Sequence, residues 1–401
     1  MSAIRVPTSV TGSLAALALL SVVPTAAESQ TNQSQHHSFR VVTVAENLAN
    51  PWSMAFLPNG DMLFTERPGR LRVIRNGRLL SNPVPGVPEV RAQGQGGLLD
   101  IVLHPDFETN RLIYMSYSKP NGDENVSGAA GSSEATTAIA RARFENDQLT
   151  NFEEIFEAQA WATGNAHFGS RIQFDADGYL FFTVGDRGAS PVDGPRDAHP
   201  AQNLSNHRGT VIRLHDDGRV PSDNPFVGRA EARPEIWSYG HRSPQGLFIH
   251  PVTGDIWEGE HGPQGGDEVN LIVRGANFGW PVIGEGVNYG GGQIHDSNRR
   301  PGMEAPRHFW VPSIATSGML IYLGDEFPEW RGSMFVGGLS GQQLARLEME
   351  GQRIVSEETL LEGLGRVRDI RQGPDGFIYI AIDGRAGALT PILRLEPVAE
   401  D

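Results

Sequence analysis

"RIQFDADGYLFFTVGD", residues 171–186, contains an apolar segment, a tight turn of Asp and Gly residues, and a second apolar segment. This pattern is typical of two antiparallel β-strands joined by a turn. It occurs five more times along the chain, which gives six copies. The others are "MAFLPNGDMLFTE" (54–66), "LLDIVLHPDFETNRLIYMSY" (98–117), "GLFIHPVTGDIWEGE" (246–260), "MLIYLGDEFPEWRGSMFVGG" (319–338) and "DIRQGPDGFIYIAID" (369–383).

Repeated hairpins cannot each bury an apolar face alone, so they must stack on one another. Spacings of several tens of residues suit the blades of a β-propeller with loop insertions. A further turn and strand follow each copy, most clearly in "ERPGRLRVIRNGRLL" (66–80). We therefore predict an all-β fold, a six-bladed β-propeller with four-stranded antiparallel blades. A β-sandwich or an open barrel explains six similar units less well.

The two ends of the repeat region favour a closed ring. "FRVVTVAE" (39–46) precedes the first copy without a hairpin partner of its own, and "PILRLEP" (391–397) follows the last. Pairing these segments within one blade would remove an exposed sheet edge. We expect the propeller, as the catalytic domain, to cover residues 39–397.

The N-terminal segment indicates export. Residues 1–27 have Arg5, the apolar run "SLAALALLSVV" and the small-residue sequence "PTAA", as in a secretory signal peptide. The run is too short to span a bilayer, which needs about 20 residues. We predict a periplasmic or secreted protein that does not span the membrane, with a flexible linker at residues 28–38.

Composition excludes several classes of function. The 401 residues include 48 acidic and 33 basic side chains, a formal charge of −15, so the chain has no general attraction for nucleic acid or anionic membranes. Cys is absent, which excludes thiol catalysis, thiolate metal sites and disulfides. Small-molecule ligands remain, and a homodimer is not excluded.

The residues before the first strand of each blade should meet at one mouth of the central channel. Arg binds carboxylates in a planar, bidentate way, so three Arg residues at one mouth suggest a ligand with several carboxylates. For any single Arg, a salt bridge to the acidic surface is the simpler interpretation. The residues that share this position are Gln95, His167, Arg242, Ser313, Arg366 and Arg368.

His167 is the candidate base. The same hairpin ends in Gly185 and Asp186, and antiparallel strands would bring that carboxylate near the ring. An Asp that accepts from one ring nitrogen fixes the tautomer and leaves the other nitrogen as a general base. The alternative is a histidine with a purely structural role.

"GEHGPQGGDEVNLI" (259–272) is a candidate cation site, because a Gly- and Pro-rich backbone can turn carbonyl oxygens toward a hard cation. Asp267 and Glu268 are either ligands or caps of the loop. An ordinary surface turn fits the sequence equally well.

Taken together, the chain resembles the soluble quinoprotein aldose sugar dehydrogenases of the glucose/sorbosone dehydrogenase family, periplasmic enzymes that use pyrroloquinoline quinone. The similarity covers nearly all of residues 40–396, with the motifs in the family's order. They are "GQGGLLDIVLHPDF", "HFGSRIQFDADGYLFFTVGDRG", "GHRSPQGLFIHP", "EHGPQGGDEVNLI", "GANFGWP" and "RVRDIRQGPDGFIYI".

The resemblance implies a six-bladed propeller with the quinone over the channel mouth. It implies that His167 takes the proton of the sugar's anomeric hydroxyl while hydride passes to the quinone, and that Asp186 orients His167. The carbonyls of Gly262 and Pro263 would bind a calcium ion that also contacts the quinone and polarises it. The implied cofactor contacts are Gln95, Arg242, Ser243, Arg366 and Arg368.

Three positions depart from the family pattern. Ser340 follows Leu339 where relatives have a cofactor-binding Lys, and Ser243 stands where Asn is common. Both bear on the strength of cofactor binding. Ala166 precedes the base where glucose-oxidising members have Asp, which bears on glucose preference.

Three functions follow from these observations. The first is a dehydrogenase that oxidises the anomeric carbon of aldoses to lactones and passes electrons to an external acceptor. The second is a calcium-dependent hydrolase of the lactonase kind, although such sites usually gather carboxylates and this mouth gathers Arg. The third is a non-catalytic propeller that binds a carbohydrate or a protein partner.

Overall fold

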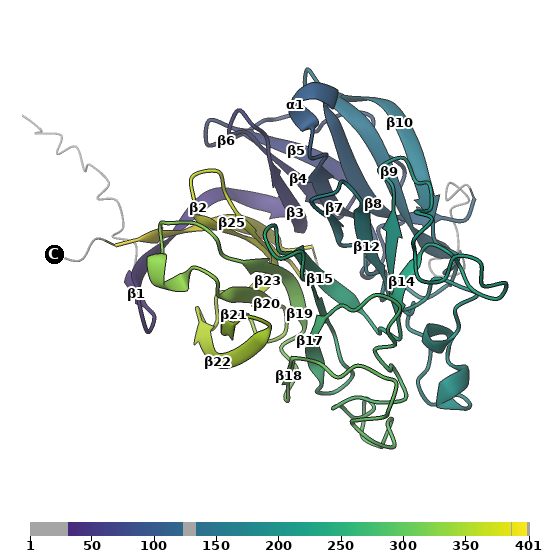
Figure 1. Cartoon of the computed structure of the whole chain (residues 1–401). Helices are drawn as coiled ribbons and strands as arrows, with labels where there is room; N and C mark the ends of the chain where they lie inside the picture. Colours follow the sequence, from purple (N-terminus) through teal and green to yellow (C-terminus); the bar gives the residue numbers. More distant parts are fainter. Residues whose placement is uncertain (1–30, 123–133, 386, 399–401) are drawn as a thin grey trace, which may run out of the picture.

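Six antiparallel sheets surround a common centre in the computed structural model, which describes residues 31–122, 134–385 and 387–398 (Figure 1). The predicted six-bladed propeller is confirmed. Helix is confined to short segments of the described chain, namely α1 (Phe107–Asn110), η1 (Arg196–Ala198), η2 (Pro200–Gln202) and η3 (Pro328–Trp330).

The strands of each blade are given in order from the innermost, which lines the channel, to the outermost. Blade 1 consists of β3 (Pro51–Phe56), β4 (Met62–Glu66), β5 (Arg70–Arg75) and β6 (Arg78–Leu79). Blade 2 consists of β7 (Leu98–Leu103), β8 (Leu112–Pro120), β9 (Ala135–Glu145) and β10 (Gln148–Glu157). Blade 3 consists of β11 (Ile172–Phe174), β12 (Leu180–Val184), β13 (Thr210–Leu214) and β14 (Ile236–Tyr239).

The other three blades follow the same plan. Blade 4 consists of β15 (Pro244–Ile249), β16 (Ile256–Glu260), β17 (Asp267–Leu271) and β18 (His308–Trp310). Blade 5 consists of β19 (Thr316–Ile321), β20 (Met334–Gly338), β21 (Gln343–Glu350) and β22 (Arg353–Leu360). Blade 6 consists of β23 (Arg366–Gln372), β24 (Ile378–Asp383), β25 (Leu389–Pro397), β2 (Ser38–Ala49) and β1 (Thr31–Gln33).

The core lies between neighbouring blades. Tyr114 and Ile139 of blade 2, for example, pack with Ile172 and Phe182 of blade 3 in one buried cluster. Each blade therefore supplies apolar side chains to both of its neighbours. This is why a hairpin that cannot stand alone is stable within the ring.

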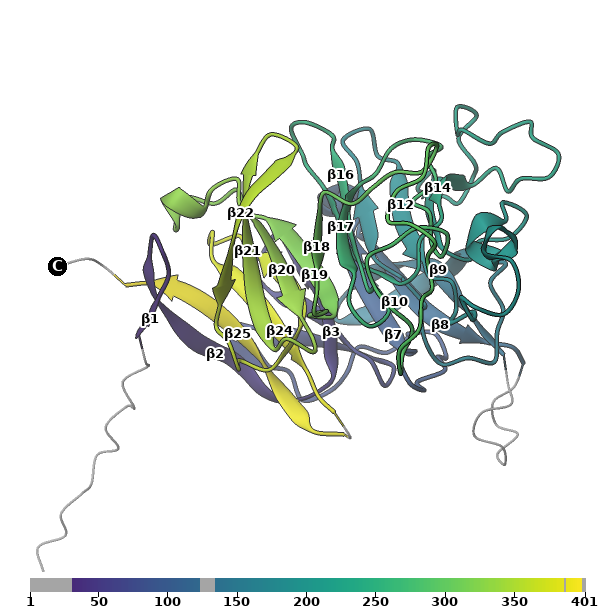
Figure 2. The same ribbon diagram turned by 90° about the horizontal axis from the view of Figure 1, so that it is seen from below.

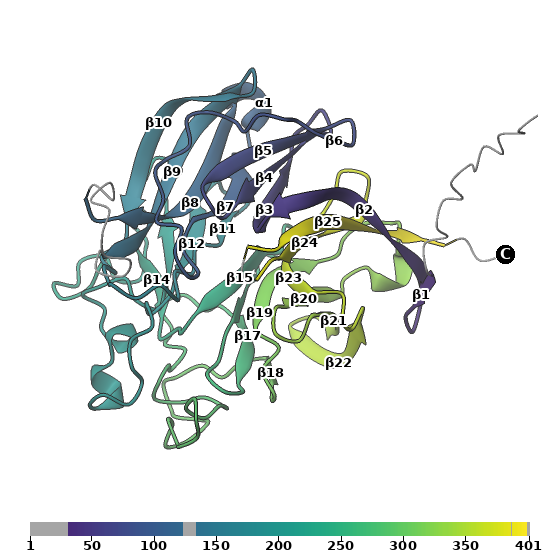
Figure 3. The same cartoon turned by 180° about the vertical axis from the view of Figure 1, so that it is seen from behind.

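The two ends of the chain close the ring. β2 pairs with β25, as the sequence predicts, and Figures 2 and 3 show the violet β2 beside the yellow β25. Joining the two ends in one sheet leaves no open seam between the first and last blades.

The expectation of a flexible linker at residues 28–38 is wrong for the described part of that segment. β1 pairs with β2 as a fifth strand of blade 6, and the His37 ring packs edge-on against Phe327 and Trp330. His37 Nε2 also lies 2.9 Å from Glu329 Oε2. A polar segment is therefore ordered by tertiary contacts that its composition does not reveal.

Residues 1–27, the predicted signal peptide, lie outside the described residues. Among the residues that are described, no helix is long and apolar enough to cross a membrane.

The centre of the channel is filled by buried charges. Arg171 lies 2.8 Å from Asp369, and Arg371 lies 2.8 Å from Asp100 and 2.9 Å from Asp369. Arg171 also donates to the backbone oxygen of Arg368 at 2.8 Å. Residues of blades 2, 3 and 6 thus form a network of ion pairs between the inner strands, which we call the floor of the channel.

Candidate active site

His167 and Asp186 form a buried pair at the mouth of the channel. His167 precedes β11 and Asp186 follows β12, and Nδ1 of the ring lies 2.6 Å from Oδ1 of the carboxylate. Asp186 is fully buried, whereas the His167 side chain is 13% exposed. The ring is therefore partly accessible to solvent, while its orienting group is shielded from water.

The local backbone explains this contact. His167 has a φ of +52°, in the left-handed region, and a Cβ on Gly185 would lie 2.3 Å from the His167 carbonyl oxygen. Only glycine allows the two segments to approach so closely. Gly185 thus permits the packing that brings Asp186 to the ring.

The Asp186 carboxylate is held in its charged form. Burial alone raises its pKa, but the charge of His167 and the hydrogen bond from its ring, with smaller effects from Arg242 and His199, bring the pKa below the usual value. Its Oδ1 also accepts from the Gly188 backbone at 2.8 Å. A charged Asp186 favours the tautomer with a proton on Nδ1, which leaves Nε2 of His167 as the basic nitrogen.

Gln95 and Arg242 are connected to this pair. Gln95 Oε1 accepts from the His167 backbone N–H at 2.8 Å, and the Arg242 carbonyl accepts from the Asp186 N–H at 2.8 Å. Ser243 is fully buried behind Arg242, where its hydroxyl accepts from Gln245 at 3.4 Å. Predicted residues of blades 2, 3 and 4 thus lie together.

Arg366 and Arg368 extend the site to blade 6. Arg368 donates to Gln245 at 3.0 Å and lies 3.4 Å from Asp383, which also lies 3.6 Å from Arg366. Arg366 donates to the Leu339 carbonyl at 3.1 Å, beside the exposed Ser340. The network of hydrogen bonds and ion pairs therefore runs from blade 4 to Leu339 in blade 5, next to Ser340.

The buried arginines are only partly compensated by nearby carboxylates and hydrogen-bond acceptors. Burial lowers the pKa of Arg368 to about 10; Asp383 opposes this shift, and Arg171 and Arg366 add to it. Nε of Arg242 and Nε of Arg368 are buried without a hydrogen-bond partner among the described residues. Such orphaned donors fit an anionic ligand with several carboxylates, and pyrroloquinoline quinone is one.

His261 links the same groups. Burial lowers its pKa well below the usual value, and three nearby charges lower it further. These belong to Arg368, Arg242 and His167. The candidate base and two of the three arginines therefore lie near enough to this partly buried ring for their charges to act on it.

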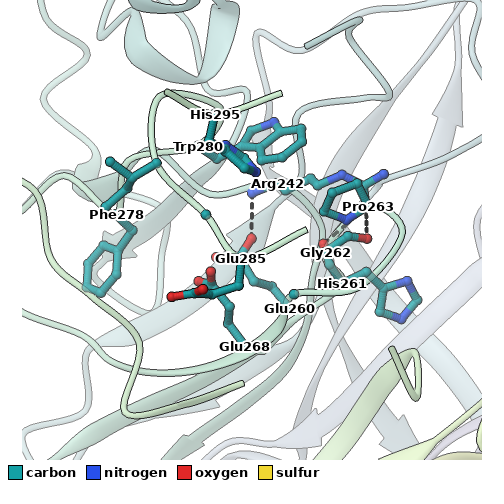
Figure 4. Close-up of a pocket in the computed structure, with 13 residues that line it drawn as sticks. Arg242, Glu260, His261, Gly262, Pro263, Glu268, Phe278, Trp280, Glu285 and His295 are labelled. Atoms are coloured by element: carbon teal, nitrogen blue, oxygen red, sulfur yellow. Dashed lines mark hydrogen bonds between the residues drawn. The ribbon is translucent and has the colours of Figure 1, made fainter. Parts of the chain in front are cut away.

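The Gly-rich loop of blade 4 presents carbonyl oxygens to a positive charge. Arg242 donates to the carbonyls of His261 at 3.0 Å and Gly262 at 2.7 Å, and Figure 4 shows its guanidinium directed toward both. A Cβ on Gly262 would lie 2.2 Å from the Gly266 backbone, so the fold of this loop requires glycine. Together with Pro263, these residues line one pocket. Carbonyl oxygens are ligands that a hard cation prefers, and the Gly262 carbonyl accepts from Arg242 here.

A cluster of buried acidic side chains and one histidine lies in the same blade as this loop. His241, Glu258 and Glu260 are buried, with ligand atoms within 4.8 Å of one another, and could hold a metal ion. Asn270 donates to Glu258, Glu260 and Glu268, at 3.1, 3.1 and 3.4 Å respectively. Burial and the charge of Glu260 raise the pKa of both Glu258 and Glu268 well above the usual value.

Sequence reasoning did not single out several residues of the site. Trp280 donates to Asp186 at 2.8 Å, and Asp383 pairs with the two blade 6 arginines. Arg67 donates to the Gly94 carbonyl, and its charge acts on Arg366 and Arg368. Trp280 lies in "GANFGWP" and Arg67 in "FTERP", but these sequences do not indicate which residues the fold brings next to them.

Comparison with known proteins agrees with the resemblance drawn from the sequence motifs. The family model described as Glucose / Sorbosone dehydrogenase matches residues 48–391. The aldose sugar dehydrogenase YliI of Escherichia coli is 41% identical over 359 residues, which cover 88% of this chain and 92% of that protein.

Two solved structures share the fold over most of the chain. The apo form of the soluble aldose sugar dehydrogenase from Escherichia coli has a TM-score of 0.81 and 37% identity, over 90% of this chain and 100% of that one. The PQQ-bound form of an aldose sugar dehydrogenase from Streptomyces coelicolor has a TM-score of 0.69 and 26% identity, over 90% and 98%. The resemblance inferred from the motifs is confirmed, and the chain belongs to the glucose/sorbosone dehydrogenase family.

Proposed function

We propose that the protein is a quinone-dependent dehydrogenase that oxidises the anomeric carbon of aldoses to lactones. The observation that carries this proposal is the meeting of His167, bound to Asp186, with Arg242, Arg366 and Arg368 at one channel mouth. A base alone or an arginine cluster alone would be ambiguous. Their combination supplies both a proton acceptor and a place for an anionic redox cofactor.

His167 takes the proton from the anomeric hydroxyl. Its Nδ1 is engaged by Asp186, so the free Nε2 is the atom that accepts the proton. As the O–H bond breaks, a C=O bond forms at the anomeric carbon. The hydrogen bound to that carbon leaves as hydride, with the electron pair of the broken C–H bond. Pyrroloquinoline quinone, when bound, supplies the acceptor for that hydride. Asp186 stabilises the positive charge that His167 acquires.

The arginines hold the cofactor. Arg242 comes from blade 4, and Arg366 and Arg368 come from blade 6, so the carboxylates would be bound from different sides. Gln95 and Ser243 would complete the contacts. Arg67 provides further positive charge next to this group, at a mouth where Ser340 replaces the Lys of relatives.

The carbonyls of Gly262 and Pro263 would hold a calcium ion. Their loop lies directly beside Arg242, so a cation there would adjoin the cofactor. It would contribute positive charge to the bound group and help to fix its orientation.

The proposal also covers the sugars that are oxidised, the electron acceptor and the cellular location. Ala166 offers no carboxylate next to the base, so we propose an aldose dehydrogenase that is not specialised for glucose. We also propose export to the periplasm or the medium, where an external acceptor reoxidises the cofactor. Association into a homodimer stays a prediction.

Reconstitution tests the proposal. Purified protein is combined with the quinone and calcium, and dye reduction is followed with a panel of aldoses, with each component omitted in turn. We expect saturable quinone binding and sugar-dependent turnover that requires both additions. Failure to bind the quinone, with no turnover of any aldose, would contradict the proposal. Hydrolysis of lactones without quinone would instead support the lactonase alternative.

A further inference from the structure

Both oxygens of the Asp186 carboxylate are engaged. Oδ1 accepts from His167 Nδ1 at 2.6 Å and from the Gly188 N–H at 2.8 Å. Oδ2 accepts from the indole Nε1 of Trp280 at 2.8 Å, and Nε2 of His199 lies 4.0 Å away. Because Asp186 is fully buried, water cannot replace a lost donor. The indole is the donor to Oδ2, and together with the two bonds to Oδ1 it fixes the rotation of the carboxylate, and through it the plane of His167.

Trp280 is itself held rigidly. Its backbone N–H donates to Gly240 at 2.8 Å, and its carbonyl accepts from Gln202 at 2.7 Å. The side chain is only 6% exposed, and the rings of His199 and His295 meet it edge-on, with centroids at 6.2 and 5.6 Å. The indole can therefore direct its N–H with little freedom.

The face of the same indole supports Arg242. The guanidinium carbon of Arg242 lies 5.1 Å from the ring centroid, close enough for a cation–π contact, and Figure 4 shows Trp280 next to Arg242. One side chain thus contacts both the carboxylate that orients the base and an arginine at the cofactor site.

We propose that Trp280 is a positioning residue that orients His167 through Asp186 and aligns Arg242 with the same ring. This inference rests on the proposed function of His167. Trp280 touches neither the sugar nor the reacting atoms in this account. Its effect is transmitted by the hydrogen bond from Nε1 to Asp186 and by the face of the ring.

Trp280→Phe separates the two contributions, because phenylalanine keeps an aromatic face and lacks the N–H. In the reconstituted holoenzyme we expect kcat to fall roughly 10- to 100-fold, since a misaligned base loses part of the 10²- to 10⁴-fold effect of general base catalysis. KM for the aldose and the affinity for added quinone should stay within about twofold, because Arg242 keeps an aromatic neighbour.

Trp310→Phe is the matched control. Trp310 is also 6% exposed, and its Nε1 donates to the Glu357 carboxylate at 2.8 Å, away from His167. This variant loses the same kind of bond and should keep its kcat. An equal fall of kcat in both variants would overturn the inference.

A double-mutant cycle with Asp186→Asn tests whether Trp280 acts through Asp186. If it does, Trp280→Phe should cost little further kcat in the Asp186→Asn background. The same factor in both backgrounds would show an independent effect and contradict the proposal. Absence of sugar-dependent turnover in the wild-type holoenzyme would instead defeat the proposed function itself.

A spectroscopic measurement does not depend on the folding of the Trp280 variant. The chain has seven Trp residues, so ¹⁵N-tryptophan labelling gives a small set of indole signals. Asp186→Asn should shift one indole N–H signal strongly, because its acceptor loses its charge. If no indole signal responds, the Trp280 bond to Asp186 does not exist in solution and the inference fails.

Discussion

The position of the His167 ring depends on the backbone around it as well as on Asp186. The left-handed backbone of His167 and its approach to Gly185 place the ring beside Asp186. The order of His, strand, turn, strand and Gly-Asp in the sequence predicted this contact, because hairpin geometry joins the two ends. The bond from Trp280 was not predicted, since Trp280 lies 94 residues after Asp186 along the chain and only the closed ring brings the two together.

Gly185→Ala should impair the base more than it impairs the fold. The added methyl would meet the His167 backbone at 2.3 Å and push it away from Asp186, so we expect kcat to fall at least about tenfold. Gly178→Ala is the control in the same hairpin. Its Cβ would have open space at φ +80°, so it should cost about 1 kcal/mol of stability and leave kcat unchanged. Equal kcat in the two variants would contradict this role of Gly185.

Ser340→Lys should strengthen quinone binding. Ser340 is exposed next to Leu339, whose carbonyl accepts from Arg366, so a lysine there could reach the arginine cluster and an anionic ligand. A charge-assisted hydrogen bond contributes about 1.5 kcal/mol, which corresponds to roughly tenfold in affinity. Titration of the quinone by absorbance measures it. Ser356→Lys, on the exposed β22, should have no effect, and a similar gain there would point to net charge alone.

At the scale of elements, the closing of blade 6 shows how far sequence patterns reach. β2 and β25 were predicted to pair because both are apolar segments without another partner. β1 has the sequence Thr-Asn-Gln, which carries no apolar alternation, so nothing in its composition indicated a strand. Contacts of His37 with Phe327 and Trp330 order this segment instead.

Phe39→Ala tests the ring closure. Phe39 is fully buried in β2 and packs edge-on against Trp330 of the neighbouring blade, so truncation should cost about 3 to 5 kcal/mol of unfolding free energy. Phe152→Ala, at a position that is 43% exposed in β10, should cost much less. Denaturant midpoints measure both. Equal midpoints would mean that the closing strand contributes little to stability.

At the scale of the whole molecule, the six repeats predicted the ring, and the shared position before each inner strand led us to expect Gln95, His167, Arg242, Arg366 and Arg368 at one mouth. The floor of Asp100, Arg171, Asp369 and Arg371 was not predicted, because charged residues on inner strands give no sign of their partners before the ring closes. The same holds for Asp383, which balances part of the charge of two arginines.

Asp383 should make the fold sensitive to acid. Burial raises its pKa, but Arg368, the hydrogen bond from Asn50 and further Arg charges lower it more, so the folded value lies below the usual 3.8. A carboxylate with a lowered pKa contributes stability above its unfolded pKa and loses it as the pH falls through the folded value. We expect unfolding free energy to drop below about pH 4, and more steeply in the wild type than in Asp383→Asn. Identical slopes would contradict this account of Asp383.

The most direct test of the central claim is a single-turnover measurement on His167→Gln loaded with quinone and calcium. The reduction of bound quinone by an aldose is followed by absorbance, and quinone affinity is measured on the same sample. His215→Gln, whose ring packs on Tyr179 away from the mouth, is the control. We predict unchanged quinone binding and a 10²- to 10⁴-fold slower reduction for His167→Gln, with the control at the wild-type rate. Reduction of the quinone at the wild-type rate in His167→Gln would show that this histidine is not the base.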